Sequence, residues 1–380
     1  IEDLMLNHSA NSMMTAVMDY AVIVARLYEK ALTLGSLTLN TADEYVMRYE
    51  SDYCFIDQYY RLANETYFGI DPTSELFDTV QKVKRGLDQN YSKLCNRINL
   101  EWTRCLKETG GMDEVHLLRQ YNFYDEKIKS IHKKVVVIVS DALRYEVAQE
   151  LIGELAKTRH IASLKPAIAM LPSETKYSKP SLLPHRELKL YGKGEEQGMA
   201  VDDHILDTTQ KRSEHLQVYR DGAVCVPFET VAEYNQEKNH EIFKHPLVYI
   251  FHDVIDKTGH DGNAKQIVNS CRDAITELKR MIPTIHASYS VTEVYVTSDH
   301  GFLFNDIMFA DKDKHKIEED YLERSTRYYL TKSKDEVSGV VKFPLSEVSG
   351  MVNVDDVMVA VPKGTNRFAA PSGGYMFTHG

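Results

Sequence analysis

The sequence predicts an α/β fold: a mostly parallel sheet flanked by helices and preceded by an all-helical N-terminal region. Residues 133–141, 247–251 and 293–298 are apolar runs rich in β-branched residues and lack the alternation of a half-exposed strand. Strands buried on both faces show this pattern, as in a parallel sheet. Helical patterns follow the first two runs, at residues 142–156 and 264–281. Alternation of strand and helix is the signature of a sheet with helices on both faces.

Residues 1–130 are predicted to form a helical N-terminal domain. Apolar residues recur at helical spacing between residues 14 and 27, and similar stretches cover residues 44–63 and 74–107. Ser74 is predicted to cap the last of these helices at its start. No catalytic cluster is visible in this region, so we expect it to serve as a partner-binding or platform domain.

Residues 131–380 are predicted to form the sheet domain. Residues 185–245, between the first two strands, are polar, rich in Lys and Glu and weakly patterned. A segment of this length is usually a lid or an inserted subdomain, so we predict a lid-like insert there. Short strands joined by turns are predicted near the C-terminus, at residues 327–331, 340–343 and 357–361.

Composition limits the function classes. The formal net charge of −11 argues against a surface built mainly to coat nucleic acid, although a local basic pocket remains compatible with it. The five cysteines are odd in number and form no CxxC pair, which favours reduced thiols in the cytoplasm. No apolar stretch approaches the length of a membrane span, so we expect no membrane association.

Acidic and histidine residues follow all three predicted strands. Asp141 ends the first strand, Asp256 and His260 follow the second, and Asp299 and His300 end the third. In open α/β sheets, ligands bind at the carboxyl ends of the strands, so we expect these side chains to converge. Carboxylate and imidazole ligands suit Zn²⁺ or Mn²⁺.

Each of these motifs has a simpler interpretation when it is taken alone. Asp141 stands where a helix N-cap is common, and residues 256–262 could be a glycine-rich polar loop. Residues 299–301 could be a strand-ending turn, although the glycine also permits the break that lets both ligands face one ion. His252 and Asp253 are ranked below these ligands and are expected to orient them.

Thr175 is the candidate nucleophile, in a turn that follows Pro172. Contact with a divalent cation lowers the pKa of a hydroxyl, and a helix beginning there would direct amide N–H groups at a phosphate. Ser173 is the rival nucleophile. Basic residues make the neighbourhood suitable for phosphate, with a solvated charged surface as the alternative interpretation: Lys176, Lys179, Arg186, Lys189 and Lys193.

The order of these motifs resembles the alkaline phosphatase superfamily, especially its nucleotide pyrophosphatase/phosphodiesterase branch, and within the superfamily the PglZ-domain proteins. The segments that carry the likeness to PglZ are Ser140–Ala148, Leu171–Thr175, Leu182–His185 and Thr297–Phe302. The resemblance covers about residues 130–380. The preceding helical region is similar to the one that precedes the domain in PglZ proteins of BREX phage-defence systems.

The resemblance implies an alkaline-phosphatase-like sheet and two metal sites. One site would use Asp256, His260 and His379, and the other Asp141, Asp299 and His300, with Thr175 bridging or adjacent. Residues expected to bind phosphate or support the ligands are Lys176, Arg144, His252 and Asp253. The family pattern continues past Gly380, so we expect a C-terminally truncated fragment.

The predicted function is a metal-dependent phosphohydrolase, by preference a phosphodiesterase, of a bacterial phage-defence system. Thr175 would attack phosphorus between two divalent cations, with Zn²⁺ expected first and Mn²⁺ second. The expected partners are a phosphate ester or phosphodiester, including a nucleotide or nucleic acid, and other phage-defence proteins. The alternatives are a scaffold subunit whose metals serve structure, with little turnover, and a phosphoryl transferase.

Overall fold

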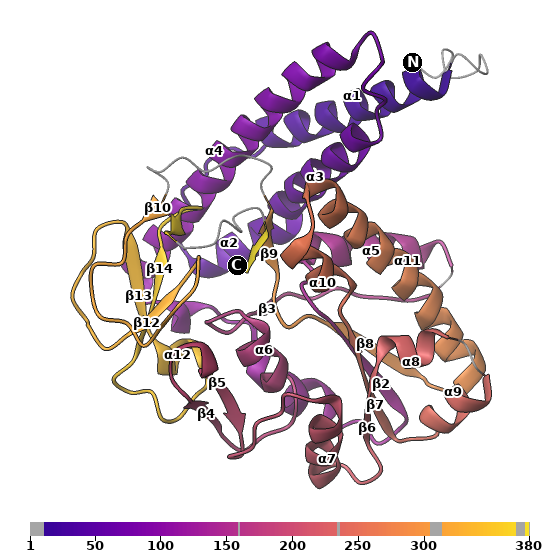
Figure 1. The fold of residues 1–380 in the computed structure, drawn as a ribbon, viewed down its shortest axis with the longest axis vertical. Coiled ribbons are helices and arrows are strands. Elements are labelled where there is room, and N and C mark those ends of the chain that lie inside the picture. The colour runs from indigo at the N-terminus through magenta and orange to yellow at the C-terminus, as the bar shows by residue number, and fades with distance from the viewer. Residues whose placement is uncertain (1–10, 159, 234–235, 305–313, 370–376, 380) are drawn as a thin grey trace.

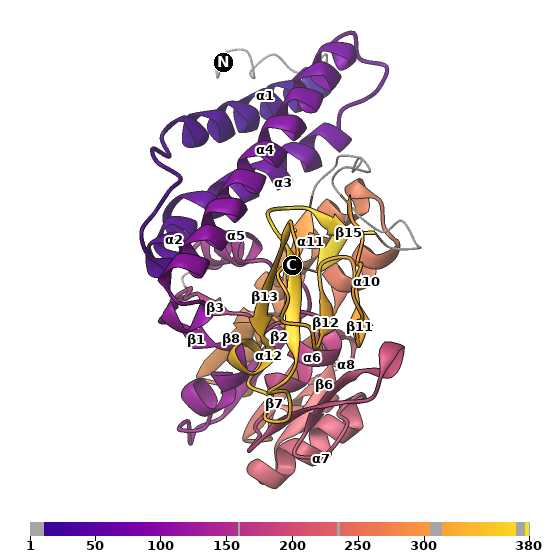
Figure 2. The same cartoon turned by 90° about the vertical axis from the view of Figure 1, so that its left-hand side faces the viewer.

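The structure is a computed structural model that describes residues 11–158, 160–233, 236–304, 314–369 and 377–379. Its N-terminal helices extend from one end of the molecule, and the parallel sheet lies toward the other end (Figures 1 and 2). Two pairs of two-residue strands are parallel, β1 with β3 and β10 with β15. Their bounds are Leu118–Arg119, Ala167–Ile168, Lys314–His315 and Arg367–Phe368.

The N-terminal region is helical, as predicted. Its helices are α1 (Asn11–Leu32), α2 (Ala42–Arg48), α3 (Cys54–Phe68) and α4 (Phe77–Thr109). The single helix expected over residues 44–63 is divided, because a π-helical segment, Tyr49–Tyr53, separates α2 from α3.

Helix α4 begins later than the sequence indicated. Asp71 forms a local turn in which its Oδ1 accepts the backbone N–H of Thr73 at 2.8 Å. The N–H of Phe77 then donates to the Ser74 carbonyl at 2.9 Å, so the regular helix starts at Phe77 rather than Ser74. Local side-chain hydrogen bonds of Asp compete with helix formation in this way.

The predicted α/β class is confirmed. Within the described residues, four parallel strands form the main sheet in the order β6-β7-β2-β8. Their bounds are Val224–Pro227 (β6), Leu247–His252 (β7), Val135–Ser140 (β2) and Glu293–Thr297 (β8). Every residue of β2 and β7 is buried, which explains their unbroken apolar runs.

Helices cover both faces of this sheet. Val136 and Ile138 of β2 belong to a core shared with α3, α5 (Tyr145–Ala156) and α11 (Ala264–Tyr289). Val135, Val137 and Val139 point to the opposite face, as alternation along a strand requires, and share a second core with α6 and α7. Helices α6 and α7 are Thr175–Ser181 and Thr209–Tyr219.

The segment expected to be a lid-like insert contributes to the sheet itself. Residues 185–245 contain an antiparallel hairpin, β4 (Leu188–Tyr191) with β5 (Gly198–Val201), then α7 and the edge strand β6. Two short helices follow, α8 (Phe228–Ala232) and α9 (Gln236–Ile242). The expectation of an insert is therefore wrong for β6, because this strand pairs with β7.

The C-terminal part forms a second, antiparallel sheet. Within the described ranges its order is β11-β12-β14-β13. Its strands are Glu323–Arg324 (β11), Tyr329–Thr331 (β12), Val340–Pro344 (β13) and Met358–Pro362 (β14), with the short helix α12 (Leu345–Ser349) after β13. Strand β9 (Phe302–Phe304) pairs antiparallel with β16 (Phe377–His379), which brings the end of the described chain back to the main sheet.

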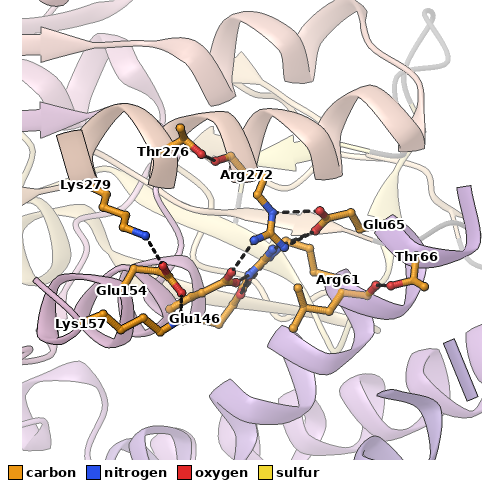
Figure 3. A network of polar contacts seen from close by, with 11 residues as sticks. Arg61, Glu65, Thr66, Glu146, Glu154, Lys157, Arg272, Thr276 and Lys279 are labelled. Carbon is orange, nitrogen blue, oxygen red and sulfur yellow. Dashed lines mark hydrogen bonds and ion pairs between the residues drawn. The ribbon is translucent and has the colours of Figure 1, made fainter. Parts of the chain in front are cut away.

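A buried ion-pair network joins the N-terminal helices to the sheet domain. Arg61 of α3 donates to both carboxylate oxygens of Glu146 of α5, at 3.0 and 3.1 Å, and to Glu150. Arg272 of α11 donates to Glu65 of α3 at 2.9 and 3.0 Å (Figure 3). Arg61 and Glu146 are 1% and 0% exposed, whereas the Arg272 side chain is 43% exposed, so the network runs from the interior to the surface.

Among the described residues, no helix combines the length and apolar character that crossing a membrane requires. The five cysteines carry free thiols.

Candidate active site

The carboxyl ends of β2, β7 and β8 meet at one edge of the sheet. Ser140 lies opposite His252, and the next N–H, of Asp141, donates to the His252 carbonyl at 2.7 Å. Ala142 then adopts a left-handed conformation with φ of 61°, which is costly for a residue with a Cβ atom. Its N–H donates to Asp299 Oδ1 at 3.2 Å, so the turns after β2 and β8 are joined.

The chain breaks after β8, as the glycine in this motif suggested. The chain bends at Asp299, where the carboxylate of Asp299 accepts the N–H of His300 at 2.8 Å. Gln120, from the end of the N-terminal region, donates its amide to the carbonyls of Ser298, at 2.9 Å, and Asp299. Sequence reasoning missed Gln120, because nothing local to it indicates a partner almost 180 residues away.

His300 has its imidazole held in one tautomer. Its Nδ1 lies 3.0 Å from the Gly301 carbonyl, which can only accept, so Nδ1 carries the hydrogen. Nε2 faces Thr175 Oγ1 at 3.0 Å, Asp299 Oδ2 at 3.5 Å and Asp256 Oδ1 at 3.7 Å. Metal-binding histidines are typically oriented by such a bond from the other ring nitrogen.

Thr175 is the first residue of α6, as predicted, and both of its neighbours are anchored. Glu174 accepts hydrogen bonds from Tyr328 at 2.9 Å and Ser325 at 2.7 Å. Lys176, expected to contact phosphate, pairs instead with the buried carboxylate of Glu323. These contacts fix the start of α6 against the C-terminal sheet and so fix the position of the Thr175 hydroxyl.

Lys179 lies beside the first predicted ligand. It stands one helical turn after Thr175, is buried, and donates to Asp141 Oδ2. The sequence showed it only as one of several basic residues near Thr175. A second cation, Arg212 of α7, stacks on Phe251 with its Cζ 4.7 Å from the ring centroid. Burial lowers the pKa of Arg212, and Asp141 and Asp299 act against that effect. Sequence reasoning gave no signal for Arg212.

The carboxylates of this site are electrostatically strained. Burial raises the pKa of Asp141 to about 7, with a further contribution from Asp299 and an opposing one from Lys179. Burial likewise raises the pKa of Asp299 to about 6, against the influence of Lys179. Asp141 Oδ1 and Asp299 Oδ2 are buried and accept no hydrogen bond. Buried carboxylate oxygens without donors suit a bound cation.

The residue types at this site suit a divalent cation, but their present arrangement does not form a metal site. Among the described side chains, no group of three or more His, Cys, Asp or Glu residues is arranged to hold a metal ion as it stands. Lys179 pairs with one oxygen of Asp141. The side chains of two predicted ligands, His260 and His379, lie outside the described part of the structure.

The backbone nevertheless brings positions 260 and 379 toward the site. Helix α10 (Val254–Asp261) carries Asp256 and, one turn later, residue 260. A Cβ atom on Gly259 would collide with the ring of Phe377, so α10 packs against β16. In β16, residue 379 pairs with Phe302, two positions after His300.

The remaining predicted residues surround the site rather than enter it. His252 uses both ring nitrogens, toward Ser140 Oγ at 2.8 Å and Glu277 Oε2 at 2.9 Å, which agrees with a supporting role. Asp253 is exposed before α10. Arg144 pairs with Asp57 of α3 at 2.9 Å.

Comparison with known proteins agrees with the geometry. The family described as "BREX system PglZ alkaline phosphatase-like domain" matches residues 123–380. The chain is 25% identical over 370 residues to the alkaline phosphatase-like protein PglZ of Bacillus cereus (strain H3081.97), covering 93% of this chain and 42% of that protein. It is 28% identical over 342 residues to the alkaline phosphatase-like protein BrxZ of Escherichia coli O9:H4 (strain HS), covering 85% of this chain and 38% of that protein. The chain thus spans about two fifths of each relative, and it belongs to the PglZ family of alkaline phosphatase-like proteins.

Proposed function

We propose that this chain is a metal-dependent phosphoesterase of a BREX phage-defence system, with phosphodiesters as its substrates and other defence proteins as its partners. One observation supports it above others. The Thr175 hydroxyl lies 3.0 Å from His300 Nε2, at a strand-end cluster of buried carboxylates, in a PglZ domain.

Two groups of residues would hold the cations. Asp141, Asp299 and His300 form one group, and Asp256 with His260 and His379 forms the other. Two divalent cations, Zn²⁺ by preference or Mn²⁺, would neutralise phosphoryl oxygens and lower the pKa of the Thr175 hydroxyl. His300 would keep Nε2 directed at the site through its Nδ1–H bond to Gly301.

Thr175 would carry out the first step of the reaction. Its Oγ would form a bond to phosphorus while the bond from phosphorus to the leaving alcohol breaks, and that alcohol would take the proton that Thr175 loses. Water would then attack the phosphothreonine, releasing the phosphomonoester and restoring the hydroxyl. The anchoring of Glu174 and Lys176 supports this role, because in-line attack depends on an oxygen held in place.

The preference for diesters rests on the Asp256-to-His260 spacing, which resembles that of the phosphodiesterase branch. A lid over residues 185–245 would also favour diesters, but part of that segment is the sheet strand β6.

The test is hydrolysis of bis(4-nitrophenyl) phosphate with added Zn²⁺ or Mn²⁺. We expect Thr175→Ala to lower kcat by roughly 10³-fold or more, as removal of a nucleophile does in other enzymes. Ser173→Ala is the matched control, two residues away, and should retain turnover. Full activity in Thr175→Ala, or its loss in Ser173→Ala alone, would overturn the assignment.

Thermal melting with and without a chelator separates this function from the scaffold alternative. Metals that serve structure alone would raise the melting temperature without any hydrolysis of the diester. Metal-dependent turnover that disappears in Thr175→Ala, whose melting temperature stays close to that of the parent chain, would support the enzyme.

A further inference from the structure

A cavity of about 430 Å³ lies between the N-terminal helices and the sheet domain. One wall comes from α2, the π-helical segment and α4, and the other from Arg144, Tyr145 and residues 301–304. Its volume falls within the range of cavities that bind small molecules. The reaction proposed above does not use it.

Aromatic side chains dominate the lining. Trp102, Tyr49 and Tyr145 are half-buried, and each lines the cavity. Trp102 meets Tyr45 edge-on, with ring centroids 5.6 Å apart and planes at 67°. Tyr49 meets Tyr145 in the same manner, at 5.8 Å and 73°. Edge-on packing leaves ring faces available for a flat group to stack on.

The carboxylate of Asp57, in the cavity wall, is already paired. Asp57 accepts from Tyr91 at 2.8 Å, from Tyr49 at 2.9 Å and from Arg144 at 2.9 Å. Burial raises the pKa of both tyrosines, so their hydroxyls stay protonated and donate. A cationic ligand group would have to compete for Asp57, whereas a flat, uncharged ring would leave these contacts intact. Arg144 Nη1 and Tyr53 Oη, buried donors in the same lining, make no hydrogen bond within the described residues and could donate to acceptor atoms of such a ring.

The cavity adjoins the candidate active site. Gly301, which lines it, is bonded directly to His300, and its carbonyl accepts the hydrogen of His300 Nδ1. Arg144, on the same wall, follows Asp141 by three residues. Its guanidinium lies over the ring of Phe302, with Cζ 5.2 Å from the centroid. The cavity and the candidate active site therefore share a wall at residues 300 and 301.

We propose that this cavity binds the base of a nucleotide whose phosphate group lies at the active site. The substrate class is then a nucleotide diester or an unpaired end of nucleic acid, recognised by stacking. The position of the phosphate rests on the proposed function, and the position of the base rests on the cavity alone. Stacking on aromatic side chains tolerates every base and needs no broad basic surface, which suits a chain with a net charge of −11.

Trp102 provides a direct test, because it is the single tryptophan of the chain. With a chelator present, thymidine 5′-monophosphate should quench its fluorescence saturably, and ribose 5-phosphate, which lacks a base, should not. Tyr145→Leu should weaken the binding about tenfold, the effect expected for the loss of one stacking ring, whereas Tyr145→Phe should not. Tyr321→Leu, at an exposed tyrosine outside the cavity, is the control. Equal quenching by both ligands, or by neither, would overturn the proposal.

A kinetic comparison separates the failure of this proposal from the failure of the proposed function. The two substrates are the 4-nitrophenyl esters of thymidine 5′-monophosphate and of methyl phosphate. We expect a KM about tenfold lower for the thymidine ester, and Tyr145→Leu should remove this preference. Hydrolysis of both esters with equal KM would overturn the base site and leave the esterase. Saturable quenching without hydrolysis of either ester would overturn the esterase and leave the base site.

Discussion

Two clusters of charged side chains in this molecule differ in whether their carboxylates are paired with cations. In the network between the N-terminal helices and the sheet domain, Glu65, Glu146 and Glu150 each have an arginine within 4 Å. At the strand ends, Asp141 and Asp299 have buried oxygens without donors, and Lys179 pairs with Asp141. The Arg61–Glu146 pair and the two aspartates are equally buried, so their difference is one of pairing.

This difference separates a structural cluster from a functional one. Bidentate arginine–carboxylate pairs replace most of the hydrogen bonds to water that burial removes. They also fix how α3, α5 and α11 pack. A carboxylate cluster short of cations destabilises the fold, and such strain concentrates where a ligand is to be bound. Breaking the first cluster should therefore affect stability, and breaking the second should affect activity.

The largest effect is expected for Asp299→Asn. Hydrolysis of bis(4-nitrophenyl) phosphate should fall by roughly 10³-fold, because a ligand carboxylate is lost. The melting temperature of the metal-free protein should stay or rise, because a buried repulsion between carboxylates is removed. Turnover at the parent level would remove Asp299 from the site.

Arg61→Met should reverse that pattern. It leaves Glu146, 0% exposed, without its main partner, which should cost about 3–5 kcal/mol of the free energy of unfolding. Urea unfolding measures this loss. The double variant Arg61→Met, Glu146→Leu should recover much of it, since no unpaired charge remains. A single variant as stable as the parent chain would mean that the network contributes nothing.

A smaller effect is expected from pH in the presence of a chelator. The folded-state pKa values of Asp141 and Asp299 are about 7 and about 6, above their ordinary value of 3.8. The folded chain therefore binds protons more tightly than the unfolded chain. This stabilisation is complete below pH 3.8 and is lost as the pH rises through 6 and 7. Each tenfold difference in proton affinity between the folded and unfolded chains corresponds to about 1.4 kcal/mol of the free energy of unfolding. Melting temperatures from pH 5 to 8 should fall, and less steeply in Asp299→Asn.

The smallest effect is expected for Lys107→Ala. The ion pair of Lys107 with Glu336 joins the same two regions as the arginine network, but its side chains are 66% and 90% exposed. Exposed pairs are screened by solvent, so the melting temperature should not change measurably. A clear drop would show that pairing across the two regions matters even without burial.

Much of the fold could be predicted from local patterns. The β-branched runs that became β2, β7 and β8 were visible because both of their faces are buried or partly buried. Strand β6 was missed because it is four residues long and lies in a polar segment, where pairing with β7 rather than its own pattern makes it a strand. The break between α2 and α3 was missed because a π-helical segment keeps almost helical spacing.

Part of the candidate site could likewise be predicted from the sequence, and part could not. The meeting of Asp141, Asp299 and His300 could be predicted, because topology places the ends of parallel strands together. The contacts of Lys179 and Gln120 could not, because they depend on how α6 and the N-terminal region pack against that edge. Metal binding by Asp141, Asp299 and His300 stays a prediction.

The arginine network also indicates how far one folding domain extends along the chain. The family match begins at residue 123, yet the buried core around Val136 and Ile138 continues without interruption to Tyr60 and Leu87 of the N-terminal helices. A polypeptide that started at residue 123 would expose that apolar surface to water and leave Glu146 without its arginine from α3. The segment that the family model matches is thus smaller than the unit of folding, and we expect the N-terminal helices and the sheet domain to melt together.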